Sequence, residues 1–236
     1  KKQRVINIIT YDFSDITATN HMYNGNFKEL VVKVQCESNF KGISDDVAGT
    51  SGTAFFINKK GNLLTNNHVV EGCKLSKINY FNKEYDANLI ATDNMLDLAL
   101  LEVELKPKAF ISFSKDELKK RDLIIIAGYP LGKYLSDDLK INEGKISSLK
   151  GFDNNSNEIT VDLAINLGNS GGPIVNENGQ LVAVAVSGMS KEVTEGISFG
   201  IKYSAVENFL KSNKISPNFG LTSFSMNKDK VNQLLE

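Results

Sequence analysis

A serine lies between glycines in residues 168–173, which have the sequence GNSGGP. Glycine permits the sharp backbone turn that would present the Ser170 hydroxyl and direct neighbouring main-chain N–H groups toward one point. Such a combination suits acyl transfer, because the oxyanion formed by nucleophilic attack needs hydrogen-bond donors at that point. The segment could equally be an ordinary glycine-rich turn, and it also satisfies the G-x-S-x-G pattern of α/β-hydrolases. The motif alone therefore decides neither function nor fold.

The order of the possible partners along the chain narrows the choice. Both histidines, His21 and His68, precede Ser170, whereas an α/β-hydrolase places its histidine after the serine. A subtilisin-like order requires the acid before the histidine in a helix-rich chain, and this sequence is rich in strand-like segments. The order histidine, acid, serine on a β-rich scaffold remains, and this is the order of chymotrypsin-like barrels.

Two positions are the preferred base and acid. His68 follows the apolar segment 63–66 and is preferred to His21, which lies in a polar lead-in, although a histidine at a strand end is often only a packing or surface residue. Asp97 immediately precedes the apolar run 98–103. A buried carboxylate is costly unless it is hydrogen-bonded, so an acid at this place either caps a turn or holds a partner. Asp93 is the alternative acid, and Asp97 is preferred because it adjoins the strand and would be less solvated.

The elements that must position these residues are short strands. Apolar or alternating runs between Gly, Asn and Asp turns are typical of an all-β barrel or sandwich. Two series of runs are separated by a polar, charged crossing at residues 104–122, which indicates two lobes of similar strand count. The first series is 30–35, 53–57, 63–66, 75–81, 87–91 and 98–103, and the second is 123–127, 140–147, 158–161, 173–176, 180–187 and 197–201. A helix is predicted after them, because residues 204–207 fit a capping box and Val206, Phe209 and Leu210 form one apolar stripe.

Charge and composition argue against several classes of function. With 27 basic and 28 acidic residues the net charge is −1, so no global field attracts nucleic acid or an anionic membrane. The longest apolar runs are strand-sized and far shorter than the roughly 20 residues of a membrane span. Cys36 and Cys73 either form one bridge or remain two buried thiols. Together with the two histidines they lack the ligand spacing of a zinc site, so neither a metal nor another cofactor is expected.

Three segments together resemble the HtrA/Deg group of trypsin-like serine proteases. They are residues 65–70 (TNNHVV), 97–101 (DLALL) and 168–173 (GNSGGP), with fainter matches at 51–57 (SGTAFFI), 128–132 (GYPLG) and 196–201 (GISFGI). The resemblance implies an all-β fold of two six-stranded antiparallel β-barrels with a C-terminal helix. It also implies serine endopeptidase activity on protein or peptide substrates. The domains would be an N-terminal extension (1–28), the first barrel (29–114), the second barrel (115–203), and the helix and tail (204–236).

The resemblance also assigns roles to residues. Ser170 would be the nucleophile, His68 the base and Asp97 the acid that orients it, in a cleft between the barrels. The oxyanion hole would be formed by the main-chain N–H groups of Gly168 and Ser170, with help from Asn169. Because Asn169 stands where digestive trypsins have the aspartate that pairs with a newly freed N-terminus, zymogen-type activation is not expected.

Substrate preference follows from the same comparison. Trypsins place an acid six residues before the nucleophile to select Lys or Arg, and this chain has Ala164 there. We therefore predict cleavage after small or medium aliphatic residues, with the substrate backbone pairing along residues 186–188. The predicted substrate-binding residues are Ile165, Val186, Ser187, Gly188 and Met189.

The chain departs from the HtrA pattern at both ends. Too few residues follow the predicted helix for the C-terminal PDZ domain that HtrA proteases usually carry, and residues 1–27 contain no recognisable trimer-forming region. The oligomeric state is therefore open, and a periplasmic or secreted location is favoured by the resemblance alone. Two alternatives compete with an active protease. One is a catalytically silent relative that acts as a peptide-binding or chaperone module. The other is an unrelated β-rich module in which Ser170, His68 and Asp97 do not converge.

Overall fold

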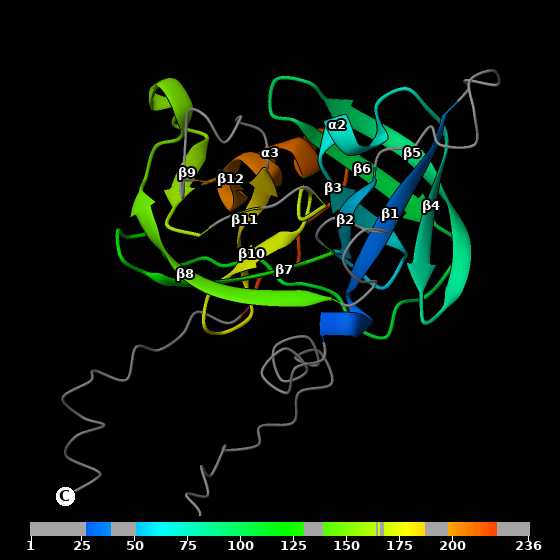
Figure 1. The fold of residues 1–236 in the computed structure, drawn as a ribbon, viewed down its shortest axis with the longest axis horizontal. Coiled ribbons are helices and arrows are strands. Elements are labelled where there is room, and N and C mark those ends of the chain that lie inside the picture. The colour runs from blue at the N-terminus through cyan, green and yellow to red at the C-terminus, as the bar shows by residue number, and fades with distance from the viewer. Residues whose placement is uncertain are drawn as a thin grey trace, which may run out of the picture.

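The described part of the chain folds into two β-barrels followed by a helix (Figure 1). A computed structural model describes residues 27–38, 51–129, 139–163, 165, 168–186 and 198–220. Each barrel is closed and six-stranded, with neighbouring strands antiparallel, in the order β1-β2-β3-β6-β5-β4 for the first and β10-β11-β12-β9-β8-β7 for the second. The predicted all-β class and two-barrel architecture are confirmed. The predicted domain limits themselves stay a prediction, although the strands of each barrel lie within them.

Some strands of the first barrel bury both of their faces. The barrel is built from β1 (Val31–Ser38), β2 (Ser51–Phe56), β3 (Asn62–Thr65), β4 (Cys73–Tyr80), β5 (Lys83–Asp93) and β6 (Leu98–Val103). Because successive side chains of a strand point to opposite faces, Ala99 and Leu101 of β6 fill the barrel interior. Leu98 and Leu100 of the same strand instead join a second core, in which the two barrels meet. This double burial explains the nearly continuous apolar run of β6.

The second barrel has its own interior of branched aliphatic side chains. Its strands are β7 (Leu123–Gly128), β8 (Lys140–Ser148), β9 (Glu158–Val161), β10 (Pro173–Val175), β11 (Leu181–Val186) and β12 (Ser198–Lys202). Ile124, Ile146, Ile159 and Ile174 pack inside it. Short helical turns complete the described elements: η1 (Phe27–Glu29), α2 (Asn67–Val70) and η3 (Phe152–Asn154).

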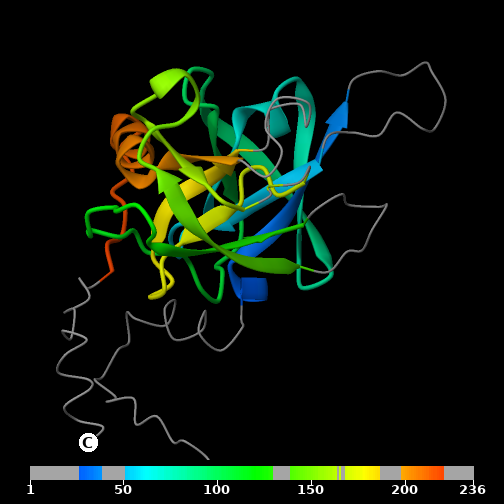
Figure 2. The same cartoon turned by 60° about the vertical axis from the view of Figure 1, so that its left-hand side comes forward.

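Helix α3 (Tyr203–Ser212) lies against β11 and β12, and Figures 1 and 2 show it in orange beside them. The predicted apolar stripe is confirmed, because Val206, Phe209 and Leu210 are all buried in the core shared by the two barrels. The predicted capping box is wrong. The N-cap is Lys202, which makes no side-chain capping bond, and Ser204 lies inside the first turn. Lys202 is still paired with Ala183 in the sheet, so the chain passes directly from strand to helix.

The crossing between the barrels is more than a solvated linker. Its charged part, residues 115–121, contains no helix and is largely exposed, as a solvated turn would be. Upstream of that part, Ala109, Ile111 and Phe113 are fully buried in the core shared by the two barrels. The crossing therefore helps to join the barrels as well as to connect them.

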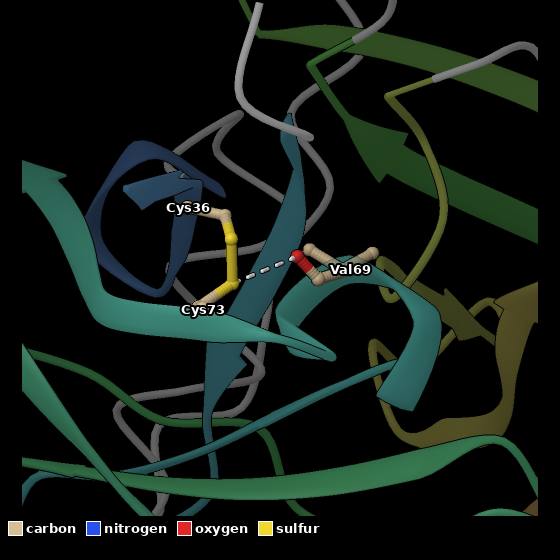
Figure 3. The surroundings of a disulfide bond; sticks show 3 residues. All are labelled: Cys36, Val69 and Cys73. Atoms are coloured by element: carbon tan, nitrogen blue, oxygen red, sulfur yellow. Dashed lines mark hydrogen bonds between the residues drawn. A yellow bond between two sulfur atoms is a disulfide. The ribbon is translucent and has the colours of Figure 1, made fainter. Parts of the chain in front are cut away.

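Cys36 and Cys73 form a disulfide that joins β1 to β4 (Figure 3). Of the two alternatives left open by the sequence, the bridge is the one found. Cys73 Sγ lies 3.8 Å from the carbonyl oxygen of Val69, a contact without a hydrogen bond because a disulfide sulfur carries no hydrogen. Among the residues that the structure describes, no three His, Cys, Asp or Glu side chains form a metal-binding group. Within the same residues, no helix has the length and apolar character of a membrane span.

Candidate active site

The His68 ring is hydrogen-bonded to the carboxylate of Asp97. His68 lies in the helical turn α2, directly after β3, rather than in the strand end itself. Its Nδ1 is 2.6 Å from Asp97 Oδ2, and its main-chain N–H donates to Asp97 Oδ1 at 2.9 Å. An ionised carboxylate only accepts hydrogen bonds, so the first contact requires the hydrogen on Nδ1. In the neutral ring, Nε2 is then left as the proton acceptor.

A tight turn between β5 and β6 brings Asp97 to this position. Asp93 Oδ1 accepts hydrogen bonds from the main-chain N–H groups of Met95 (2.9 Å) and Leu96 (3.0 Å), which closes the turn. Asp97 follows with φ of +52°, a left-handed conformation that is uncommon for a residue other than glycine. Of the two acids considered from the sequence, the structure therefore places Asp97 at His68 and Asp93 in the turn.

The main chain of Asp97 is hydrogen-bonded to neighbouring residues, as its side chain is. Its carbonyl oxygen accepts hydrogen bonds from Asn67 N–H (3.1 Å) and from Asn66 Nδ2 (2.9 Å). Asn66 is completely buried, so its amide is packed in place behind the turn. Asn66 and Asn67, which directly precede His68, thus hold in place the aspartate that is hydrogen-bonded to the His68 ring.

Ser170 lies in a loop that is bonded on several sides. Gly168 and Gly171 have φ of +95° and +79°, which accounts for glycine at both positions. The Gly172 N–H donates to Asn169 O at 2.9 Å, and the Gly171 N–H donates to Ala185 O on β11 at 3.0 Å. From the first barrel, Thr53 N–H donates to Ser170 O at 2.9 Å. The loop is therefore tied to both barrels.

The Ser170 loop and the His68 turn pack against each other. A Cβ atom added at Gly171 would overlap Thr65 Oγ1 and would lie 2.8 Å from the main-chain nitrogen of Asn66. A Cβ atom added at Gly52 would lie 2.6 Å from Val69 Cγ2 and 3.1 Å from Ser170 O. At these two glycines the neighbouring atoms lie too close for a side chain. Residues at positions 52, 66, 69 and 170 therefore lie in one small region between the barrels.

The remaining predicted site residues are only partly described. Gly168 and Asn169 lie in the Ser170 loop, where Asn169 is 1% exposed. Ile165 is partly buried, and its N–H donates to Ser198 Oγ on β12 at 2.8 Å. Val186 is the partly buried last residue of β11. Ala164, Ser187, Gly188, Met189 and His21 lie outside the described residues.

Sequence reasoning missed two buried threonines in this region. Thr53 and Thr65 are fully buried, and the hydroxyl of Thr65 donates to Thr53 O at 2.7 Å. Threonine is common in strands, so neither residue stands out in the sequence. The available signal was their position, since each lies within a segment that carries the family resemblance.

Residues 52–184 match the family model of a trypsin-like peptidase domain, which covers more than half of the chain. The chain belongs to the trypsin-like peptidase family. Its similarity to the HtrA branch is also confirmed. It is 33% identical over 178 residues to the serine protease Do-like HtrA of Bacillus subtilis, covering 70% of this chain and 39% of that protein. It is 36% identical over 169 residues to a probable periplasmic DegP-like serine endoprotease of Rhizobium meliloti, covering 68% and 32%.

Solved structures agree with this assignment. A serine endoprotease from Yersinia pestis matches with a TM-score of 0.66 and 26% identity, over 81% of this chain and 66% of that one. The HtrA-type protease AlgW, in a structure with a tripeptide, matches with a TM-score of 0.67 and 27% identity, over 78% of this chain and 60% of that one. The present chain spans less than half the length of the two curated relatives named above.

Proposed function

We propose that this chain is a serine endopeptidase in which Ser170 is the nucleophile, His68 the base and Asp97 the acid that orients the base. The observation that carries the proposal is the hydrogen bond between His68 Nδ1 and Asp97 Oδ2, on a turn packed against the Ser170 loop. This bond leaves Nε2 of the neutral ring as the acceptor, which is the state that a general base requires. Membership of the trypsin-like peptidase family supports the same assignment.

Hydrolysis proceeds in two halves. Ser170 Oγ attacks the carbonyl carbon of the scissile bond while His68 Nε2 takes the hydroxyl proton, giving a tetrahedral oxyanion. The imidazolium then gives that proton to the leaving nitrogen, the C–N bond breaks, and the acyl group stays on Ser170. Water next attacks the ester with His68 again as base, and the acid product leaves as Ser170 regains its proton. Asp97 stays ionised throughout and stabilises the imidazolium.

The proposed oxyanion hole consists of the main-chain N–H groups of Gly168 and Ser170, with that of Asn169. Its support comes from the carbonyl oxygens of Gly168 and Asn169, which accept hydrogen bonds from Thr53 Oγ1 and from the Gly172 N–H. In a trans peptide the N–H points away from the C=O of the same unit. The N–H groups of Asn169 and Ser170 therefore point away from these two hydrogen bonds, which leaves them available as the proposed donors.

For substrate preference, we propose cleavage after small or medium aliphatic residues of proteins or peptides. Ile165 and Val186 contribute apolar, partly buried side chains. Ser198 Oγ accepts the Ile165 N–H and offers no negative charge that could hold Lys or Arg. Ser187, Gly188 and Met189 complete the proposed binding residues, with residues 186–188 pairing with the extended substrate backbone.

Labelling with a fluorophosphonate probe tests the activity directly, because only an activated serine reacts. The wild-type protein should be labelled on Ser170, and labelling should vanish in Ser170→Ala and His68→Ala. Ser204→Ala, a change at an exposed serine of α3, is the matched control and should be labelled like the wild type. If the folded wild-type protein is not labelled, the catalytically silent alternative is correct.

A further inference from the structure

The side chain of Thr53 crosses from the first barrel to the Ser170 loop of the second. Thr53 lies on β2 and is fully buried. Its Oγ1 donates to Gly168 O at 2.7 Å, and the same oxygen accepts the N–H of Tyr129 at 3.0 Å. Tyr129 directly follows β7 of the second barrel. One hydroxyl of the first barrel therefore joins two separate segments of the second.

The two bonds determine where the hydroxyl hydrogen points. A main-chain N–H can only donate, so Thr53 Oγ1 must be the acceptor toward Tyr129. A hydroxyl has a single hydrogen, and Gly168 O is the acceptor available to it. The bond to Gly168 therefore has one direction, from threonine to carbonyl.

Holding the Gly168 carbonyl also orients the next N–H group. The C=O of Gly168 and the N–H of Asn169 belong to one planar trans peptide and point in opposite directions. The main-chain N–H of Thr53 holds Ser170 O in the same way, and Thr53 O is itself held by Thr65 Oγ1. Thr53 thus holds the carbonyl oxygens of two peptide units of the loop, Gly168–Asn169 and Ser170–Gly171.

We propose that Thr53 is a positioning residue of the catalytic site, whose hydroxyl sets the orientation of the Gly168–Asn169 peptide and so directs the Asn169 N–H, the helping donor of the proposed oxyanion hole. This inference rests on the proposed protease function. Because Thr53 is inaccessible, bulk water cannot replace its hydroxyl, and Gly168 O would lose the donor that orients it.

The test compares Thr53→Val, which keeps the shape and removes the hydroxyl, with Thr53→Ser, which keeps the hydroxyl. Below the melting temperature, kcat for a peptide substrate should fall about 10- to 100-fold in Thr53→Val with little change in KM. This loss is smaller than the roughly 10²- to 10³-fold that follows removal of an oxyanion donor itself. Thr53→Ser should stay within about threefold of the wild type.

A second readout separates positioning from stability. A peptide boronate forms a tetrahedral adduct with the nucleophile and places an oxygen in the oxyanion hole, whereas a product peptide does not. The affinity for the boronate should fall in parallel with kcat in Thr53→Val, and the affinity for the product peptide should not. If Thr53→Val does not fold, Thr53→Ala replaces it in both measurements.

Thr160→Val is the matched control, because Thr160 Oγ1 also donates to a main-chain carbonyl, that of Lys150, at 2.7 Å. It should keep wild-type kcat and boronate affinity. The inference is overturned if Thr53→Val lowers only the melting temperature, or if Thr53→Ser is as impaired as Thr53→Val. A wild-type protein without activity would instead refute the proposed function, and the inference with it.

Discussion

Asp97 contacts His68 through both of its carboxylate oxygens. Oδ2 lies 2.6 Å from the ring Nδ1, and Oδ1 accepts the main-chain N–H of the same histidine at 2.9 Å. The carboxylate therefore links the imidazole to the backbone that carries it, which restricts rotation of the ring. A single substitution at Asp97 can remove the ring contact while leaving the backbone contact in place.

Asp97→Asn should reduce kcat by about 10⁴-fold, the loss seen when a related triad loses its acid charge. The amide oxygen can still accept the His68 N–H, so the protein should remain folded, but an amide NH₂ facing Nδ1 would favour the wrong tautomer. Steady-state kinetics and circular dichroism measure the two effects. Asp93→Asn is the control, because that residue only closes the turn through Met95 and Leu96. A decrease of less than tenfold for Asp97→Asn would contradict the proposed role.

Gly171→Ala should abolish most activity, whereas Gly72→Ala should not. Both glycines have similar positive φ, +79° and +72°, so an alanine at either site costs about 1–2 kcal/mol of conformational strain. At Gly171 the new Cβ would also overlap Thr65 Oγ1 and crowd Asn66 N, whereas at Gly72 nothing lies within 4 Å. Displacement of the loop by about 1 Å can lower turnover about 100-fold. Equal kcat/KM in the two variants would show that this contact does not position Ser170.

Reduction of the disulfide should lower the free energy of unfolding by about 2–4 kcal/mol, because the bridge between Cys36 and Cys73 closes a long loop in the unfolded chain. Urea denaturation with and without a dithiol reductant measures the effect. The double variant Cys36→Ser/Cys73→Ser should be as unstable as the reduced protein and should not respond to reductant. Identical midpoints for oxidised and reduced wild type would count against a stabilising bridge.

Glu158 should make the folded state less stable as pH rises through the range just above the ordinary glutamate pKa. Burial raises the pKa of Glu158, and the charge of Asp97 raises it further, against hydrogen bonds from Phe152 N–H and Asn155 Nδ2 that lower it. In this range the folded state holds more protons than the unfolded state, so the free energy of unfolding decreases with pH.

Glu158→Gln should remove that decrease, and its stability relative to the wild type should rise with pH across the same range. Denaturation at a series of pH values measures it. Glu102→Gln, at an exposed residue of β6, is the control and should follow the wild-type profile. A profile for Glu158→Gln parallel to that of the wild type would exclude this contribution.

Cleavage of a peptide library should occur after Val, Ala, Leu and similar residues. The apolar side chains of Ile165 and Val186 and the uncharged Ser198 are the basis for this preference. Mass spectrometry of the products identifies the cleaved bonds, and Ser170→Ala, which should give none, controls for contaminating proteases. Enrichment of Lys or Arg before the cut would overturn the proposed pocket.

Patterned apolar segments made the barrels predictable. The run 98–103 coincides with β6, and β7 and β11 differ from their predicted ranges by at most one residue at either end. Strand β5 was predicted only over 87–91 because its first residues, Lys83 and Glu84, are polar. They are strand residues through pairing with β4, a tertiary contact that local composition does not encode.

For the candidate site, too, the sequence predicted some features and missed others. Residue types and chain order were enough to single out His68, Asp97 and Ser170. The one-turn helix α2 was missed because four residues give no periodicity. The role of Thr53 depends on hydrogen bonds to Gly168 and Tyr129, 115 and 76 residues away in sequence. No local pattern records such distant partners.

The core between the barrels has a consequence for how the molecule behaves as a whole. It combines Leu98 and Leu100 of the first barrel with Val184 of the second and Val206 and Leu210 of α3. Neither half can exclude water from its own apolar surface without the other, so the halves should unfold cooperatively and an excised half should not be stable. The packing of the His68 turn against the Ser170 loop therefore depends on side chains remote from both, and damage to α3 would reach these two segments through the shared interior.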